Sequence, residues 1–203
     1  MKRNHRWHRG DLQIIKWLFS DSINFLSKYK ILDNLRRPLV YVVSLLAILV
    51  SLFTKTLFLE TVLIVFVVLN FGYILGILDS LIFGRMKQTK ELLYIPIING
   101  IDAVLLTMVF NFLTLPYRSY IILDAFIRSI YRMVVSKKKL LEWTTADEID
   151  KSVKNNLWYY YINMLPNVIM FVVILFNLNF ESVFEVFIAV SFVLTPVLAY
   201  LLR

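Results

Sequence analysis

Long apolar runs with almost no charge are the feature that most constrains how this chain folds. Two of them, 39–54 and 57–78, follow one another across a short interruption, and two more, 157–176 and 183–202, close the chain. A helix needs roughly 20 apolar residues to cross the hydrocarbon of a bilayer, so each run is close to the required length. Because the members of each pair are only a few residues apart, the pattern predicts an all-α integral membrane protein with two transmembrane helical hairpins and four spans.

The composition supports a membrane protein and narrows the kinds of site. Hydrophobic residues fill 59% of the 203 positions, whereas soluble domains use roughly 45–50%. Cysteine is absent and the histidines are His5 and His8, so the sequence excludes thiolate metal sites and predicts no metal site in this chain. The formal net charge of +8 indicates a cytoplasmic face rich in Lys and Arg, and we predict no binding of nucleic acid.

The distribution of basic residues predicts which segments cross. Nine Lys and Arg residues lie in 1–37 and eight lie between Arg118 and Lys154. If the segment 95–116 does not cross, every basic residue except Lys55 falls on one side of the membrane, as the positive-inside bias requires. We therefore expect a re-entrant or in-plane segment at 95–116 and both termini in the cytoplasm.

Four regions follow from these patterns. Residues 1–37 form an N-terminal tail with an interfacial amphipathic helix, and Pro38 is expected to mark a break before the first apolar run of the membrane hairpin, 38–82. Residues 83–156 form a cytoplasmic or interfacial region, and 157–203 form the second hairpin.

The segment 117–136 predicts an amphipathic helix that lies along the membrane surface. At 100° per residue, one face carries the four charged side chains and the other is aliphatic. Arginines facing lipid near the bilayer centre would cost roughly 2.5–3.5 kcal/mol each, so an interfacial position is favoured over a span. The helix could simply float on anionic lipid or could dock another domain. The predicted docking residues are Arg118, Asp124, Arg128 and Arg132.

Three strings carry a resemblance to a known family. RNHRWHRGDLQ contains an R-x-x-R-W motif at Arg3, Arg6 and Trp7, and it resembles the motif that closes the catalytic domain of processive glycosyltransferases. ILDNLRRPL and LPYRSYIILDAFIRSIYRMVVSKKKLLEWTTA are similar to blocks that follow in the same order in cyclic β-1,2-glucan synthases. The chain departs from that pattern where Arg118 replaces Gln and Tyr120 replaces Trp.

The resemblance implies a function as well as a fold. It implies a membrane block after a glycosyltransferase domain and before a phosphorylase-like domain, in the bacterial inner membrane, with membrane lipid and a glucan chain as partners. The expected reaction is inverting transfer of glucose from UDP-glucose, with Arg3, Arg6 and Trp7 as substrate-binding residues. Trp can stack on a sugar and Arg can hold pyrophosphate. No catalytic residue and no cofactor are expected in this chain, and a divalent metal, Mg or Mn, is expected in the upstream domain.

Simpler interpretations stand beside these. Arg3, Arg6 and Trp7 could be a basic juxtamembrane arm with an interfacial Trp. The whole chain could be a free-standing membrane scaffold or a transporter-like protein without catalysis. Polar residues inside the apolar runs could line a glycan cavity or could pair between helices; they are Asn70, Asp79, Asn99, Asp102, Asn163 and Asn167.

Overall fold

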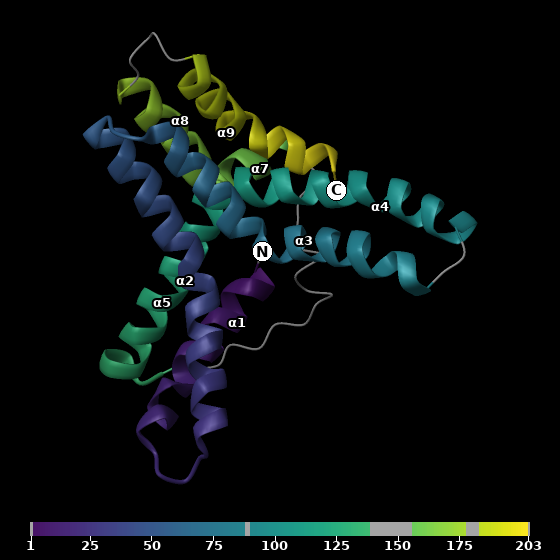
Figure 1. Cartoon of the computed structure of the whole chain (residues 1–203). Coiled ribbons are helices and arrows are strands. Elements are labelled where there is room, and N and C mark those ends of the chain that lie inside the picture. Colours follow the sequence, from purple (N-terminus) through teal and green to yellow (C-terminus); the bar gives the residue numbers. More distant parts are fainter. Residues whose placement is uncertain (1, 88–89, 139–155, 178–182, 203) are drawn as a thin grey trace.

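The computed structural model describes the backbone of residues 2–87, 90–138, 156–177 and 183–202 and the side chains of 5–79, 100, 102–138, 156–177 and 183–202. Over these residues the fold is all-helical with no strand (Figure 1), as the sequence predicts. The elements are α1 (Lys2–Gln13), the 3-10 helix η1 (Ile14–Phe19), α2 (Phe25–Thr54), α3 (Phe58–Lys87), α4 (Lys90–Leu113), α5 (Leu115–Tyr131), the π-helical turn η2 (Arg132–Ser136), α7 (Leu157–Asn163), α8 (Leu165–Asn177) and α9 (Val183–Leu201).

Three of the described helices are long and apolar enough to cross a membrane: α2, the Phe58–Asp79 part of α3, and α9. The run 157–176, expected as one helix, is instead the pair α7 and α8, which bend by 68° relative to each other. Pro166 accounts for the break between the two helices, because it has no N–H to donate to the Ile162 carbonyl and its ring would clash with that carbonyl in a continuous helix. Counting the bent pair as one span gives four spans.

Helix α2 runs without interruption through Pro38, so the expected break at that residue is not observed. The helix begins where the Asn24 side chain accepts a hydrogen bond from the Ser27 N–H at 2.9 Å. Proline inside a helix removes one backbone hydrogen bond, but apolar helices tolerate it when neighbours pack around it. Pro38 is buried. The last part of the tail, 25–37, and the first apolar run therefore form one continuous helix, whereas the earlier part of the tail forms α1 and η1.

Helices α2 and α3 pack as a helical hairpin, and the prediction that both of its arms cross the membrane stays a prediction. The turn of the hairpin uses Lys55 and Leu57, both with positive φ. Helix α3 then continues to Lys87, and α4 returns antiparallel beside it (Figure 1). Because α4 is continuous up to Leu113, residues 95–113 contain no re-entrant break. An in-plane position for this segment stays a prediction.

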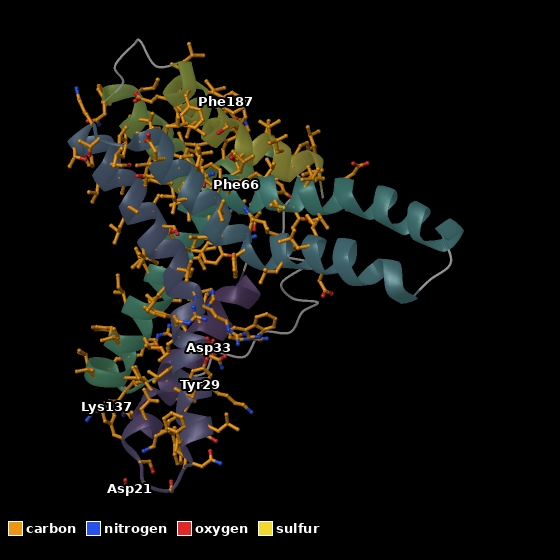
Figure 2. All side chains as sticks on the ribbon, in the orientation of Figure 1. Asp21, Tyr29, Asp33, Phe66, Lys137 and Phe187 are labelled. Carbon is orange, nitrogen blue, oxygen red and sulfur yellow. The ribbon has the colours of Figure 1, made fainter. Side chains whose placement is uncertain are left out.

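Apolar and charged residues gather at opposite ends of the molecule. The apolar end has a buried core in which the Phe112 ring stacks on Phe192 at 5.8 Å and meets Phe66 at 5.9 Å. Figure 2 shows Phe66 and Phe187 in this end and Asp21, Asp33 and Lys137 far from it, at the other. This segregation matches a protein that is partly embedded in a bilayer and partly at its surface.

Buried amides join the helices of the apolar end. Asn70 donates to the Met108 carbonyl at 3.2 Å, and Asn167 donates to the Leu113 carbonyl at 2.7 Å. These two residues therefore pair between helices. Asn163 bonds within its own helix, to the Tyr159 carbonyl. Asp79 and Asp102 are exposed, and the Asn99 side chain lies outside the described residues.

Candidate functional site

The sharp corner between α4 and α5 positions the candidate site. Pro116 sits at the start of α5, where its missing N–H costs no helical hydrogen bond, and the N-cap Thr114 makes no side-chain cap. A side chain from another helix caps the start of α5: Asn167 on α8 accepts a hydrogen bond from the Tyr117 N–H at 3.1 Å. The corner therefore fixes the first turn of α5, which carries Arg118.

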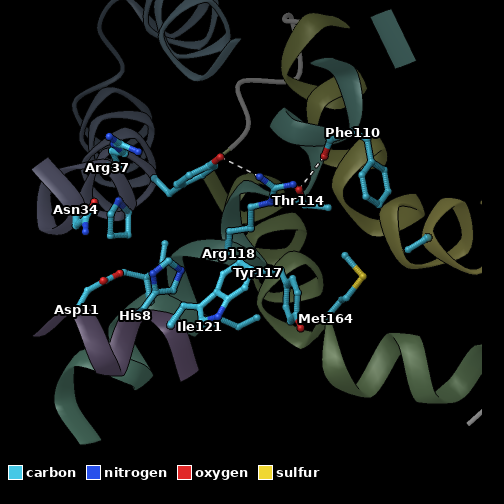
Figure 3. Close-up of a pocket in the computed structure, with 15 residues that line it drawn as sticks. His8, Asp11, Asn34, Arg37, Phe110, Thr114, Tyr117, Arg118, Ile121 and Met164 are labelled. Carbon is cyan, nitrogen blue, oxygen red and sulfur yellow. Dashed lines mark hydrogen bonds between the residues drawn. The ribbon is translucent and has the colours of Figure 1, made fainter. Parts of the chain in front are cut away.

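A pocket of about 490 Å³ opens beside this corner. Its lining comes from α1, α2, α4, α5, α9 and Met164 between α7 and α8. In Figure 3, Asp11, Asn34 and Arg37 lie on one side and Phe110 and Met164 on the other. The pocket thus joins the polar end of the molecule to its apolar end.

Trp7 of the R-x-x-R-W motif lines this pocket. Arg6, on the same helix, is half-buried and is not among the lining residues. Arg3 lies in α1, but its side chain falls outside the described residues. Of the three predicted substrate-binding residues, the structure therefore assigns Trp7 to the pocket. The binding role of all three stays a prediction.

Arg118, expected at an exposed docking surface, is instead half-buried in the pocket wall. Its Nη1 donates to the Tyr41 hydroxyl at 2.9 Å and to the Asn111 side-chain oxygen, and its guanidinium lies 5.3 Å from the Tyr41 ring centroid. Asn111 is itself held, because its amide donates to the Leu69 carbonyl at 3.1 Å. The guanidinium is thus fixed by a chain of neutral polar groups.

The other predicted docking residues meet α1. Asp124 contacts His5 at 2.9 Å and accepts from Arg128 at 2.7 Å. One turn further along α5, the Ser129 hydroxyl donates to the Arg9 carbonyl at 3.3 Å. Arg132 begins the π-helical turn after α5 and is half-buried. The polar face of α5 therefore packs on the N-terminal tail of the same chain, and docking to another domain stays a prediction.

The opposite face of α5 divides in two. Ile122, expected with the lipid-facing residues, is buried against the protein. Four other aliphatic residues remain exposed, as an interfacial helix requires: Leu123, Ile127, Ile130 and Val134.

Burial shifts the titration of three groups on α1. It lowers the pKa of His5 and of His8 below 6.5, although Asp124 opposes the shift for His5 and Asp11 opposes it for His8. Burial raises the pKa of Asp11 above 3.8, against the influence of His8. Figure 3 shows His8 and Asp11 side by side at the pocket. At neutral pH both imidazoles are therefore favoured in the uncharged form.

Sequence patterns alone did not assign Tyr41, Asn111 and Asp11 to a site. Asn111 is a polar residue in the apolar segment 95–116, and such a position is functional or pairs helices. Tyr41 gave no signal, because a single Tyr near the start of a span is an ordinary interfacial residue. Among the described residues, no group of three or more His, Asp or Glu side chains is placed to hold a metal ion.

Comparison with known proteins gives one informative relationship. No family model matches the chain. The chain is 29% identical over 171 residues to the cyclic beta-(1,2)-glucan synthase NdvB of Rhizobium meliloti (strain 1021), and the match covers 79% of this chain. It covers only 6% of NdvB, so the chain spans a small part of the length of that relative. This similarity agrees with the three sequence blocks, and the chain is therefore related to the cyclic β-1,2-glucan synthase family.

Proposed function

We propose that this chain is the membrane-embedded part of a β-1,2-glucan synthase, which anchors an upstream glycosyltransferase domain and presents a pocket to the growing glucan. The observation that carries the proposal is the meeting of distant sequence blocks. Trp7 of the first block, Asn34 and Arg37 of the second, and Arg118 of the third line one pocket. Residues that are far apart in the sequence and match the same family thus gather at one place.

The chemistry of the pocket suits a sugar polymer. An exposed indole can stack on the apolar face of a glucose ring, and amide, carboxylate and guanidinium groups can bond its hydroxyls. The catalytic base and the divalent metal for transfer from UDP-glucose would lie in the upstream domain, so this chain alone would be inactive. A phosphorylase-like domain would follow downstream.

The position in the membrane is part of the proposal. Asp21 and Lys137 lie together at the polar end (Figure 2), which supports a cytoplasmic location for the N-terminal tail and for the segment after α5. We assign the chain to the bacterial inner membrane with both termini in the cytoplasm. The pocket then faces the leaflet beneath the transferase domain.

The test uses the chain joined to the regions that flank it in the full synthase. Membranes containing this protein are supplied with labelled UDP-glucose, and the yield of β-1,2-glucan is compared for Trp7→Ala and Trp17→Ala. The two side chains are similarly exposed, 56% and 53%, but only Trp7 is among the lining residues. We expect about a tenfold lower yield for Trp7→Ala, the loss of one stacking contact, and little change for Trp17→Ala. Equal yields would remove the role given to Trp7 and favour a scaffold without substrate contact.

A further inference from the structure

The pocket has an inner wall that the R-x-x-R-W motif does not supply. Its central residues are Arg118, on the first turn of α5, and Tyr41, in α2. Arg118 is half-buried, whereas Trp7 is 56% exposed. A ligand that contacts Trp7 and extends inward would therefore meet this wall.

Arg118 is held in place but keeps hydrogen-bonding capacity. Its described bonds use Nη1 alone and go to two neutral oxygens, those of Tyr41 and Asn111. A guanidinium carries five N–H donors, so Nε and Nη2 retain three that no described residue accepts. Among the described residues, no carboxylate lies within ion-pair distance of Arg118. A fixed donor with free N–H groups loses little entropy when it binds a ligand.

The opposite side of the pocket supplies acceptors. Pro38 has no N–H to give to the Asn34 carbonyl one turn earlier, and both residues line the pocket. Asp11 adds a carboxylate. Arg118 supplies donors on one wall, Asn34 and Asp11 supply acceptors on the other, and the Trp7 indole lies at the mouth. This arrangement matches a neutral ligand with many hydroxyls. Arg37, on the same side, is already paired with Asp33, and the Asp11 carboxylate disfavours an anion such as phosphate.

We propose that Arg118, held by Tyr41 and Asn111, is a second glucan-contacting residue, which donates hydrogen bonds to a sugar unit further along the chain than the unit stacked on Trp7. This inference rests on the proposed function, because it assumes that glucan enters the pocket. It changes the role of Arg118 from a surface docking residue to a substrate-binding residue. Asn111 and the Tyr41 hydroxyl act as positioning groups.

The test measures how affinity depends on glucan length. The purified chain in detergent micelles is titrated with β-1,2-linked glucose oligosaccharides of increasing length, and binding is followed by calorimetry and by Trp emission. The variants are Arg118→Leu, Arg118→Gln, which keeps a donor, and Arg36→Leu. Arg36 is a matched control, because it is a cation close to Arg37 in α2 but does not line the pocket. Circular dichroism confirms that each variant keeps its helical content.

The expected pattern separates the two contacts. Wild-type affinity should rise with length, and Arg118→Leu should lose about tenfold for the longer oligosaccharides, the loss of a charged hydrogen bond. Binding of the shortest oligosaccharide that perturbs Trp emission should be unchanged. Arg118→Gln should recover part of the loss, and Arg36→Leu should behave as wild type.

Other outcomes overturn the inference in distinguishable ways. Equal affinities of wild type and Arg118→Leu at every length would remove Arg118 from the glucan site while leaving Trp7 in it. If inorganic phosphate displaces the oligosaccharide from wild type but not from Arg118→Leu, then Arg118 is an anion site. Absence of binding at any length would contradict the proposed function together with this extension.

Discussion

Asn167 is the residue whose replacement tests most directly how the α4–α5 corner, and with it the pocket, is held. Its side chain is fully buried, donates to the Leu113 carbonyl at 2.7 Å and accepts from the Tyr117 N–H at 3.1 Å. Asn167→Leu keeps the branched shape of the side chain and removes both bonds. The Leu113 carbonyl retains the Thr195 hydroxyl at 3.4 Å, whereas the Tyr117 N–H, in the first turn of α5, has no earlier carbonyl within its helix.

The magnitude follows from that difference. Leaving one buried backbone group without a partner costs about 1–3 kcal/mol, and hydrogen bonds between membrane helices average about 0.6 kcal/mol. We expect Asn167→Leu to lower the free energy of unfolding by about 2 kcal/mol. Asn163→Leu is the matched control, because among the described residues the Asn163 amide bonds within its own helix, and its cost should stay below about 1 kcal/mol.

The assay is reversible unfolding of the purified chain in mild detergent by increasing SDS, followed by far-UV circular dichroism. If Asn167→Leu and Asn163→Leu have the same midpoint, the capping of α5 by α8 does not contribute to stability, and the reasoning about the corner is wrong.

Two further predictions concern the contact of α1 with α5. Asp124→Leu removes the partner of His5, so amide hydrogen exchange in α1 should rise about tenfold. The control Asp79→Leu removes an exposed carboxylate on α3 and should leave that exchange unchanged. Equal rates in both variants would contradict the contact. Burial lowers the pKa of His5 and His8 below 6.5, so the undocked tail binds more protons than the docked one and docking weakens as pH falls below 6.5. Protection of α1 amides, taken relative to the intrinsic exchange rate at each pH, should therefore fall on acidification, and this fall should shrink when His5 and His8 are both replaced by Gln. Protection that does not change with pH would contradict the assignment.

Much of the fold follows from local patterns. The apolar runs predicted the turn at Lys55 and the limits of α9, because hydrophobic length and charge interruptions act residue by residue. The course of α2 through Pro38 could not be predicted, since it depends on the packing around a buried proline. The bend between α7 and α8 was not predicted: its 68° angle falls next to Pro166 but depends on the neighbouring helices.

The candidate site was predicted less completely. Trp7 was assigned to a site from its motif; it lines the pocket, and its binding role stays a prediction. The amphipathic pattern of 117–136 predicted a polar and an aliphatic face, although Ile122 of the aliphatic face is buried against the protein. Periodicity does not distinguish a polar face covered by water from one covered by another helix. For this reason the burial of Ser129 against α1 and of Arg118 in the pocket emerged only from the three-dimensional arrangement.

The central claim is that the pocket beside the α4–α5 corner binds β-1,2-glucan. The most direct measurement is fluorescence of a variant in which Trp17, Trp143 and Trp158 are replaced by Phe, so that Trp7 is the remaining indole. Titration with a β-1,2-linked glucan should give a saturable change in Trp7 emission, and a β-1,4-linked oligosaccharide of equal length should bind more weakly. Trp7 emission that is unaffected by β-1,2-glucan at all concentrations would contradict the account.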